Sequence, residues 1–206
     1  MLISFEGSEG AGKSTQIANL AEHLRTHGRS VLLTREPGGT DFGEEARNIL
    51  KHAPYGERLT DEAELLLFIA ARAQLIREVI RPALARGEIV LCDRFTDSTL
   101  AYQGAGRGLD VNFIRSLNDF ATGGLKPART YFLDLPVETG LARAKHRAAA
   151  NAPTDRMETM NRLFYDRVAR CFRQLAKDEP ERIVTLDATK TPDEIFASIR
   201  ADKIFG

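Results

Sequence analysis

The stretch Gly7–Ser14, with the sequence GSEGAGKS, fits the pattern G-x-x-x-x-G-K-[S/T] and decides the fold. An apolar run, Leu2–Glu6, precedes it, and a segment with helical spacing, Lys13–His27, follows it. In such a setting, small residues let successive backbone N–H groups turn inward around phosphate oxygens, and the positive end of the following helix points at them. A chance glycine-rich turn is the alternative, but the strand, loop and helix together predict a site for a nucleoside triphosphate.

Each polar residue of this loop has an expected task. Lys13 is expected to reach the β- and γ-phosphates, and the Ser14 hydroxyl is placed to bind Mg²⁺. The loop also carries a carboxylate, Glu9, which phosphate oxygens would repel. We therefore expect Glu9 to point out of the loop toward a second substrate, and a solvated loop residue is the alternative. The residues expected to bind ATP are Gly7, Ser8, Glu9, Gly10, Ala11, Gly12, Lys13, Ser14 and Thr15.

Strand-like runs alternate with helical segments along the whole chain, which predicts an α/β fold. The strands are continuous apolar runs, as is typical of a parallel sheet covered on both faces. We predict one P-loop domain over residues 1–206, a three-layer sandwich in which helices cover both faces of a five-stranded parallel sheet. Strands are expected at Leu2–Glu6, Ser30–Arg35, Glu88–Cys92, Ala128–Leu135 and Arg182–Leu186, and helices at Lys13–His27, Phe42–Lys51, Thr60–Arg86, Asp110–Ala121, Val137–Ala150, Asp155–Asp178 and Thr191–Ile204.

The composition argues against several other classes of protein. Lys plus Arg and Asp plus Glu both number 29, so the net charge is zero, and a general nucleic-acid or membrane-surface binder would normally be basic. No apolar stretch approaches the ~20 residues of a membrane span, and the first residues do not resemble a signal peptide. The two cysteines, Cys92 and Cys171, are too few for a disulfide framework. We expect reduced thiols and a cytoplasmic location.

The phosphate loop does not by itself name a reaction, because motors, GTPases and small-molecule kinases share it. A GTPase needs a D-x-x-G after the third strand and an N-K-x-D, and the sequence has neither there. A small-molecule kinase remains, and it needs an acceptor site. Asp93 and Arg94 leave the third strand at the sheet edge where ligands bind. There a carboxylate can hold Mg²⁺ and a guanidinium can bind a phosphate, although such a dipeptide is elsewhere usually an exposed ion pair.

Seven segments, in order, resemble the thymidylate kinase (dTMP kinase) family of bacterial type. The resemblance implies an ATP:dTMP phosphotransferase that makes dTDP for dTTP synthesis, uses ATP with Mg²⁺ and forms a homodimer. A kinase for another nucleoside monophosphate and a non-catalytic P-loop nucleotide-binding module remain alternatives. The segments are spread over almost the whole length of the chain and are FEGSEGAGKST (5–15), TREPGGT (34–40), LLFIAAR (66–72), CDRF (92–95), STLAYQGAGRG (98–108), DRME (155–158) and LDAT (186–189).

The resemblance also assigns roles on the acceptor side. Phe68 would stack on the thymine ring, and Arg72, one turn further on the same helix face, would hydrogen-bond the base. Spacing alone would place Phe68 in the core, whereas an arginine on a largely apolar helix needs a partner. Arg94 would bind the dTMP phosphate with help from Arg35, and Glu9 would contact the sugar hydroxyl or a water near the transferred group. The base and sugar would be lined by Thr99, Tyr102 and Gln103, although an ordinary polar helix face would look the same.

A small mobile lid is expected over about residues 143–157, where a basic helix end is followed by a break. Some relatives carry an arginine next to the acidic loop residue, but this chain has Gly10 there. The resemblance gives Arg147 that role toward the transferred phosphoryl group and places Arg143 at ATP, with a solvated charge run as the alternative. Whether Arg156 shares the work stays open. The expected catalytic residues are Lys13, Arg94, Arg147, Glu9 and Asp93, and the expected metal ligands are Ser14 and Asp93.

Overall fold

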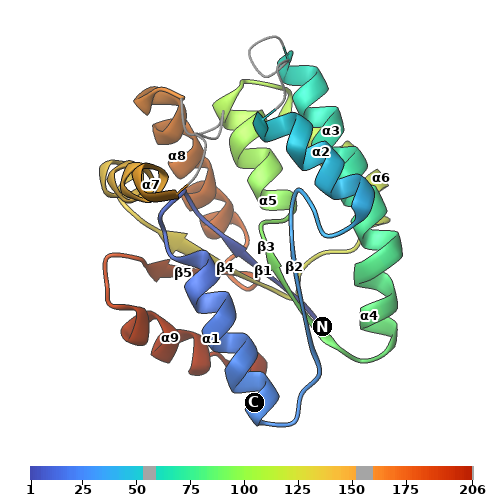
Figure 1. Ribbon diagram of the computed structural model, residues 1–206, viewed down its shortest axis with the longest axis vertical. Coiled ribbons are helices and arrows are strands. Elements are labelled where there is room, and N and C mark those ends of the chain that lie inside the picture. Colours follow the sequence, from blue (N-terminus) through green and yellow to red (C-terminus); the bar gives the residue numbers. More distant parts are fainter. Residues whose placement is uncertain (53–58, 152–159, 206) are drawn as a thin grey trace.

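The computed structural model describes residues 1–52, 59–151 and 160–205, and in these ranges five parallel strands form one sheet (Figure 1). The strand order is β2-β3-β1-β4-β5. The predicted five-stranded parallel α/β sheet is therefore confirmed, and the structure adds the order of its strands. The strands are β1 (Leu2–Glu6), β2 (Val31–Arg35), β3 (Ile89–Asp93), β4 (Arg129–Asp134) and β5 (Ile183–Asp187).

Helices cover both faces of the sheet, as the apolar strands predict (Figure 1). Helices α1 (Lys13–Thr26) and α9 (Pro192–Arg200) pack on one face, where Ile3 and Phe5 of β1 join their apolar cluster. Leu2 points the other way and joins a cluster on the opposite face. The opposite face is covered by α3 (Asp61–Leu75), α5 (Thr96–Thr99), α6 (Val111–Thr122) and α8 (Arg162–Asp178), while α2 (Asp41–His52) packs on α3 and α7 (Val137–Asn151) on α8.

The long helix expected at Thr60–Arg86 consists of three consecutive parts. After α3, a π-helical segment, η2 (Ile76–Ile80), leads into α4 (Arg81–Ala85). Pro82 lies in the first turn of α4, where its missing N–H is tolerated. The wider π turn lets the chain continue in a helical course, so the proline does not end it.

Other boundaries differ from the sequence prediction for local reasons. Helix α8 begins at Arg162, because the side chain of Asn161 caps it by accepting from the Phe164 N–H (2.9 Å). The capping box predicted at residues 155–158 lies outside the described residues. Helix α9 ends at Arg200, and a short turn, η5 (Lys203–Phe205), follows it. The segment after β3 forms α5 and a second π-helical stretch, η3 (Leu100–Gly106).

The sheet order brings the two motifs together. Strands β1 and β3 are neighbours, and Phe5 pairs with Asp93 at their carboxyl ends. The phosphate loop after β1 and the Asp93–Arg94 pair at the end of β3 therefore meet at the carboxyl ends of the strands, where open α/β sheets bind ligands. Across the described ranges, no helix is both long enough and apolar enough to cross a membrane.

Candidate active site

The glycines of the phosphate loop are required by its backbone. Gly7 has a φ of 139° and Gly10 a φ of 76°, conformations that side chains disfavour. A Cβ on Gly7 would lie 2.6 Å from the carbonyl oxygen of Leu133, and one on Gly10 would lie 2.7 Å from that of Gly140. Any side chain at position 10 would therefore clash with the first turn of α7. The loop thus packs against the end of β4 and the start of α7, which leaves no room for a Cβ at either glycine.

Lys13 places its ammonium group at the mouth of the loop. Its Nζ donates to the carbonyl oxygens of Gly7 and Ser8, both at 3.1 Å, and the residue is only 7% exposed. Burial and the nearby Arg94 cation lower the pKa of the Lys13 ammonium, and Glu9 opposes that shift. Phosphate oxygens entering the loop would offer Lys13 anionic acceptors in place of these neutral carbonyls.

Ser14 and Asp93 lie together, as metal binding would require. The Ser14 hydroxyl donates to Asp93 Oδ2 at 3.4 Å, and Asp93 Oδ1 is buried without a hydrogen-bond partner. An unpartnered carboxylate oxygen beside a hydroxyl at the phosphate loop fits a Mg²⁺ ion, or one of its waters, that phosphate oxygens would complete. Within the described part of the chain, no cluster of three or more His, Cys, Asp or Glu residues could hold a metal without such help.

Arg94 reaches the phosphate loop from the end of β3. It adopts a φ of 71°, in the left-handed region. Its Nη1 donates to the Gly7 carbonyl oxygen (3.0 Å) and to Ser98 Oγ (3.1 Å). Its Nη2 pairs with Glu9 Oε1 (2.5 Å) and donates to the Tyr102 hydroxyl (3.2 Å). One guanidinium thus joins the loop to the segment expected to bind the acceptor.

The Glu9 carboxylate pairs with Arg94, the residue directly after β3. Burial alone would raise its pKa, but the Arg94 and Lys13 cations outweigh burial and hold the pKa well below its ordinary range. Glu9 is therefore ionised. Its neighbour Tyr102 is neutral, because burial raises the pKa of this phenol to about 12 against the opposing effect of Arg94.

Arg72 lies in a buried polar cluster that the sequence analysis missed. The residue is 2% exposed, and its Nε donates to both carboxylate oxygens of Glu36 at 3.0 and 2.8 Å. Nη1 donates to Thr99 Oγ1 (3.0 Å) and Asn118 Oδ1 (2.5 Å), and Nη2 to the Phe95 carbonyl (3.1 Å) and to Glu36. These bonds use all five N–H groups of the guanidinium. A bond from Arg72 to a base would require one of them to be exchanged, so that role stays a prediction.

The missed partner Glu36 had a signal in the sequence. It lies in the quoted segment TREPGGT, and an arginine buried on an apolar helix needs an acidic partner. Arg35, from the same segment, was expected near the phosphate of the acceptor. The structure instead pairs it with Glu44 of α2 (2.9 Å), and both side chains are about half exposed.

The other expected acceptor residues differ in burial. Phe68 is half-buried, whereas its neighbours Leu65 and Ile69 are buried in the core. Helical spacing alone would place Phe68 in the core as well, and its partial exposure departs from that expectation. Gln103 is 1% exposed, and its amide donates to Glu64 Oε1 at 2.8 Å. Thr99 and Tyr102 are also buried, on α5 and η3.

Of the lid arginines, only the side chain of Arg143 is described. Its Nη1 donates to the carbonyl oxygens of Gly10 (3.3 Å) and Ala188 (3.5 Å), so it bridges the phosphate loop and the segment after β5. Arg147 lies on α7, but its side chain and the whole of Arg156 lie outside the described residues, as does part of the expected lid.

A phosphate loop that faces an Asp-Arg pair from the neighbouring strand defines a nucleotide-binding site of the P-loop class. Comparison with known proteins narrows the class: residues 5–199 match the family described as thymidylate kinase. The chain is 50% identical over 204 residues to the thymidylate kinase of Desulfovibrio desulfuricans (98% of this chain, 94% of that one) and 51% identical over 201 residues to that of Geotalea uraniireducens (97% and 94%). The chain belongs to the thymidylate kinase family.

A solved structure supports the same assignment. The crystal structure of thymidylate kinase from Ehrlichia chaffeensis superimposes with a TM-score of 0.78 at 35% sequence identity. The match covers 100% of this chain and 98% of the other. The likeness therefore extends over the whole fold, including the segments that build the candidate site.

Proposed function

We propose that this protein transfers the γ-phosphoryl group of ATP to dTMP, giving ADP and dTDP for dTTP synthesis. The observation that carries the proposal is the meeting of the phosphate loop with Arg94 and Glu9, in a chain of the thymidylate kinase family. A donor loop alone would suit many P-loop proteins. An ionised acid and a fixed arginine at its mouth suit a second, anionic substrate with a sugar hydroxyl.

On the donor side, residues 7–15 bind the triphosphate, Lys13 neutralises its β- and γ-oxygens, and Arg143 adds a cation near Gly10. Ser14 and Asp93 would hold Mg²⁺, which supplies further neutralisation of phosphate charge when bound.

On the acceptor side, Arg94 binds the dTMP phosphate and Glu9 turns to the sugar. Phe68 stacks on the base, with Arg72 at its edge. Tyr102, Thr99 and Gln103 line the base and sugar, and Arg35 approaches the phosphate after leaving Glu44. The family resemblance supports these assignments, and the positions of Arg94, Glu9 and Tyr102 are compatible with them.

The reaction needs no covalent enzyme intermediate and no dedicated base. An oxygen of the dTMP phosphate, already anionic, attacks the γ-phosphorus in line; the new P–O bond forms as the bond to ADP breaks. Holding the two reactants together can contribute on the order of 7–11 kcal/mol to lowering the barrier. Arg147 from the lid adds positive charge at the transferred group, where a well-aimed donor is worth roughly 2.7–4 kcal/mol.

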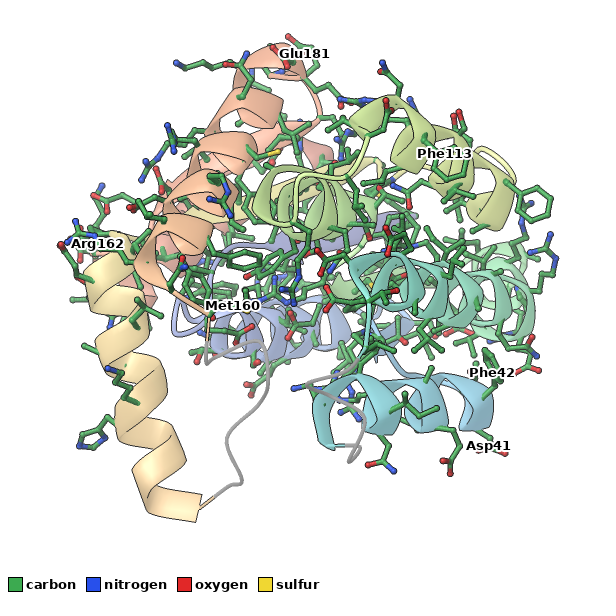
Figure 2. All side chains as sticks on the ribbon, turned by 90° about the horizontal axis from the view of Figure 1, so that it is seen from above. Asp41, Phe42, Phe113, Met160, Arg162 and Glu181 are labelled. Carbon is green, nitrogen blue, oxygen red and sulfur yellow. The ribbon has the colours of Figure 1, made fainter. Side chains whose placement is uncertain are left out.

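We also infer a homodimer. Helices α2, α3 and α6 pack side by side, and large apolar side chains on them are exposed: Phe42 and Ile49 on α2, Leu66 on α3, and Phe113 and Phe120 on α6. Phe42 and Phe113 lie on the same side of the molecule in Figure 2. A second copy of the chain would cover this apolar face, which we name the α2–α3–α6 face.

The reduced state of both cysteines agrees with a cytoplasmic location.

An acceptor panel tests the proposal. ADP release is measured with ATP and Mg²⁺ in the presence of dTMP, dUMP, dCMP or AMP. The proposal predicts that dTMP is the fastest acceptor by about tenfold or more in kcat/KM. A faster reaction with another nucleotide would make the protein a kinase for that nucleotide. Normal ATP binding without product from any acceptor would make it a nucleotide-binding module.

A further inference from the structure

Glu6 is a fully buried acid that the proposed mechanism does not use. It is the last residue of β1, directly before the phosphate loop, and its exposed fraction is 0%. A buried carboxyl group is costly unless its oxygens are hydrogen-bonded. Both oxygens of Glu6 are bonded to the segment that follows β3: Oε1 accepts from the Phe95 N–H at 2.7 Å, and Oε2 bonds to Ser98 Oγ at 2.5 Å.

These two bonds hold the segment around Arg94. The Phe95 N–H belongs to the residue directly after Arg94, so its bond to Glu6 fixes the backbone where Arg94 takes its left-handed φ of 71°. Ser98 Oγ accepts from Arg94 Nη1 at 3.1 Å, so Glu6 also reaches the guanidinium through one hydroxyl. The backbone and the side chain of Arg94 are thus both tied to the same carboxyl group.

We propose that Glu6 is a positioning residue for Arg94: through Phe95 and Ser98 it holds the guanidinium against Gly7 at the mouth of the phosphate loop. The inference rests on the proposed function, in which Arg94 binds the acceptor phosphate. Glu6 itself touches neither substrate. Glu6 is also the residue directly before the phosphate loop. One residue therefore connects the start of the donor loop with the position of the acceptor arginine.

A neighbouring polar cluster offers a matched control. Ser4, two residues earlier on β1 and also 0% exposed, bonds through its hydroxyl to Thr130 Oγ1 (2.7 Å). Thr130 also accepts from Arg182 (2.8 Å), which pairs with Asp97 (2.7 Å), and neither of these bonds involves Arg94 or Glu6. Ser4→Ala therefore removes a buried serine hydroxyl bonded to a neighbour, as Ser98→Ala does, but leaves Arg94 untouched.

The decisive comparison is between Ser98→Ala and Ser4→Ala. Ser98→Ala removes the hydrogen bond from the Arg94 guanidinium to the Ser98 hydroxyl. Because one partner of this bond is charged, we expect the KM for dTMP to rise by about tenfold, while the KM for ATP stays within about twofold. Ser4→Ala should leave both constants within about twofold of wild type. Equal KM values for dTMP in the two variants, or an equal rise for ATP and dTMP in Ser98→Ala, would overturn the inference.

Variants of Glu6 test its own part. Glu6→Ala removes both bonds, whereas Glu6→Gln keeps an acceptor for the Phe95 N–H and a polar contact for Ser98 Oγ. The inference predicts that Glu6→Gln restores most of the dTMP affinity that Glu6→Ala loses, and that adding Ser98→Ala to Glu6→Ala costs less than about twofold more. If the loss of dTMP affinity in the double variant equals the product of the two single losses, Glu6 does not act through Ser98. If Glu6→Ala does not fold, the Ser98 and Ser4 pair still decides the question.

A readout without catalysis separates this inference from the proposed function. Crystal structures of wild type and Ser98→Ala, with inorganic phosphate added, should show the Arg94 guanidinium displaced from Gly7 only in the variant. An unmoved guanidinium would overturn the positioning role even if the wild-type enzyme phosphorylates dTMP. A displaced guanidinium in a protein that does not use dTMP would end the proposed function and, with it, the role in acceptor binding, while confirming how Arg94 is held.

Discussion

Arg94 and Glu9 form an ion pair across the mouth of the phosphate loop, with Nη2 and Oε1 2.5 Å apart. The pair explains why a loop built for anions carries a carboxylate. The two charges neutralise each other, and the pairing keeps the Glu9 carboxylate ionised. In the proposed function, an acceptor phosphate would compete with Glu9 for Arg94, and Glu9 would then accept from the sugar hydroxyl.

The first prediction concerns the lid. Arg147→Ala should lower kcat by about 10²–10³, the usual loss for one transition-state donor, while the KM for dTMP changes little. Lys145→Ala is the matched control, because Lys145 is an exposed cation on the same helix. Steady-state kinetics of both variants decide the matter: a wild-type rate for Arg147→Ala would remove Arg147 from the mechanism.

The second prediction concerns the base. Phe68→Ala should raise the KM for dTMP by roughly tenfold or more, since stacking on a base is worth about 1–3 kcal/mol. Leu66→Ala, two residues earlier on α3 and 55% exposed, should leave that KM unchanged. Titration of dTMP into each variant checks the binding directly. If Phe68→Ala binds dTMP as wild type does but unfolds at a lower temperature, Phe68 packs in the protein and does not stack on the base.

The third prediction concerns the α2–α3–α6 face. Phe113 and Phe120 are 60% and 77% exposed, so charges placed there disturb an interface more than a core. The double variant Phe113→Glu/Phe120→Glu should run as a monomer of about the chain mass, 22.8 kDa, in light-scattering measurements, and wild type at twice that mass. Leu163→Glu, on α8 and 66% exposed, is the control and should stay dimeric. A monomeric wild type would refute the homodimer.

The fourth prediction concerns pH and stability. Burial, together with the Asp97 carboxylate, raises the pKa of Glu6 from an ordinary 4.5 to about 8. Between these values the native state binds more protons than the unfolded state, so stability falls as the pH rises through this window. The contribution is complete below pH 4.5 and is lost as the pH passes about 8, with a size on the order of 1–4 kcal/mol.

Urea unfolding at pH 6 and pH 9 measures this dependence. Wild type should lose stability between the two values, and Glu6→Gln, which cannot ionise, should lose clearly less. Glu22→Gln, at an exposed position of α1, should keep the wild-type difference. An identical loss in wild type and Glu6→Gln would contradict a protonated Glu6 in the native protein.

Strand positions were predictable because burial on both faces leaves a continuous apolar run. Leu2–Glu6 has the predicted bounds, and the other four strands begin one residue later than predicted and end within one residue of the predicted position. The order of the strands was not predictable, since pairing of β1 with β3 and β4 joins segments far apart in the chain. The π-helical segments also escaped prediction: η2 lies inside the helix expected at Thr60–Arg86, and no helix was expected over the glycine-containing stretch that forms η3.

The phosphate loop was predictable for a different reason. Its chemistry is local, so one short stretch specifies the backbone, the cation and the hydroxyl expected to bind Mg²⁺. The partners of Arg72 and Glu6 were not local. Glu36 lies 36 residues from Arg72, and Ser98 lies 92 residues from Glu6. A sequence shows that a buried charge needs a partner, but only the fold shows which one it meets.

The most direct test of the central claim is whether the purified wild-type protein converts dTMP to dTDP with ATP and Mg²⁺, measured by chromatographic separation of the nucleotides. The account predicts dTDP and ADP in equal amounts, and a rate reduced by about 10²–10³ in Lys13→Ala but not in the exposed control Lys177→Ala. ATP turnover that is no faster with dTMP than without it, and no dTDP, would contradict the account.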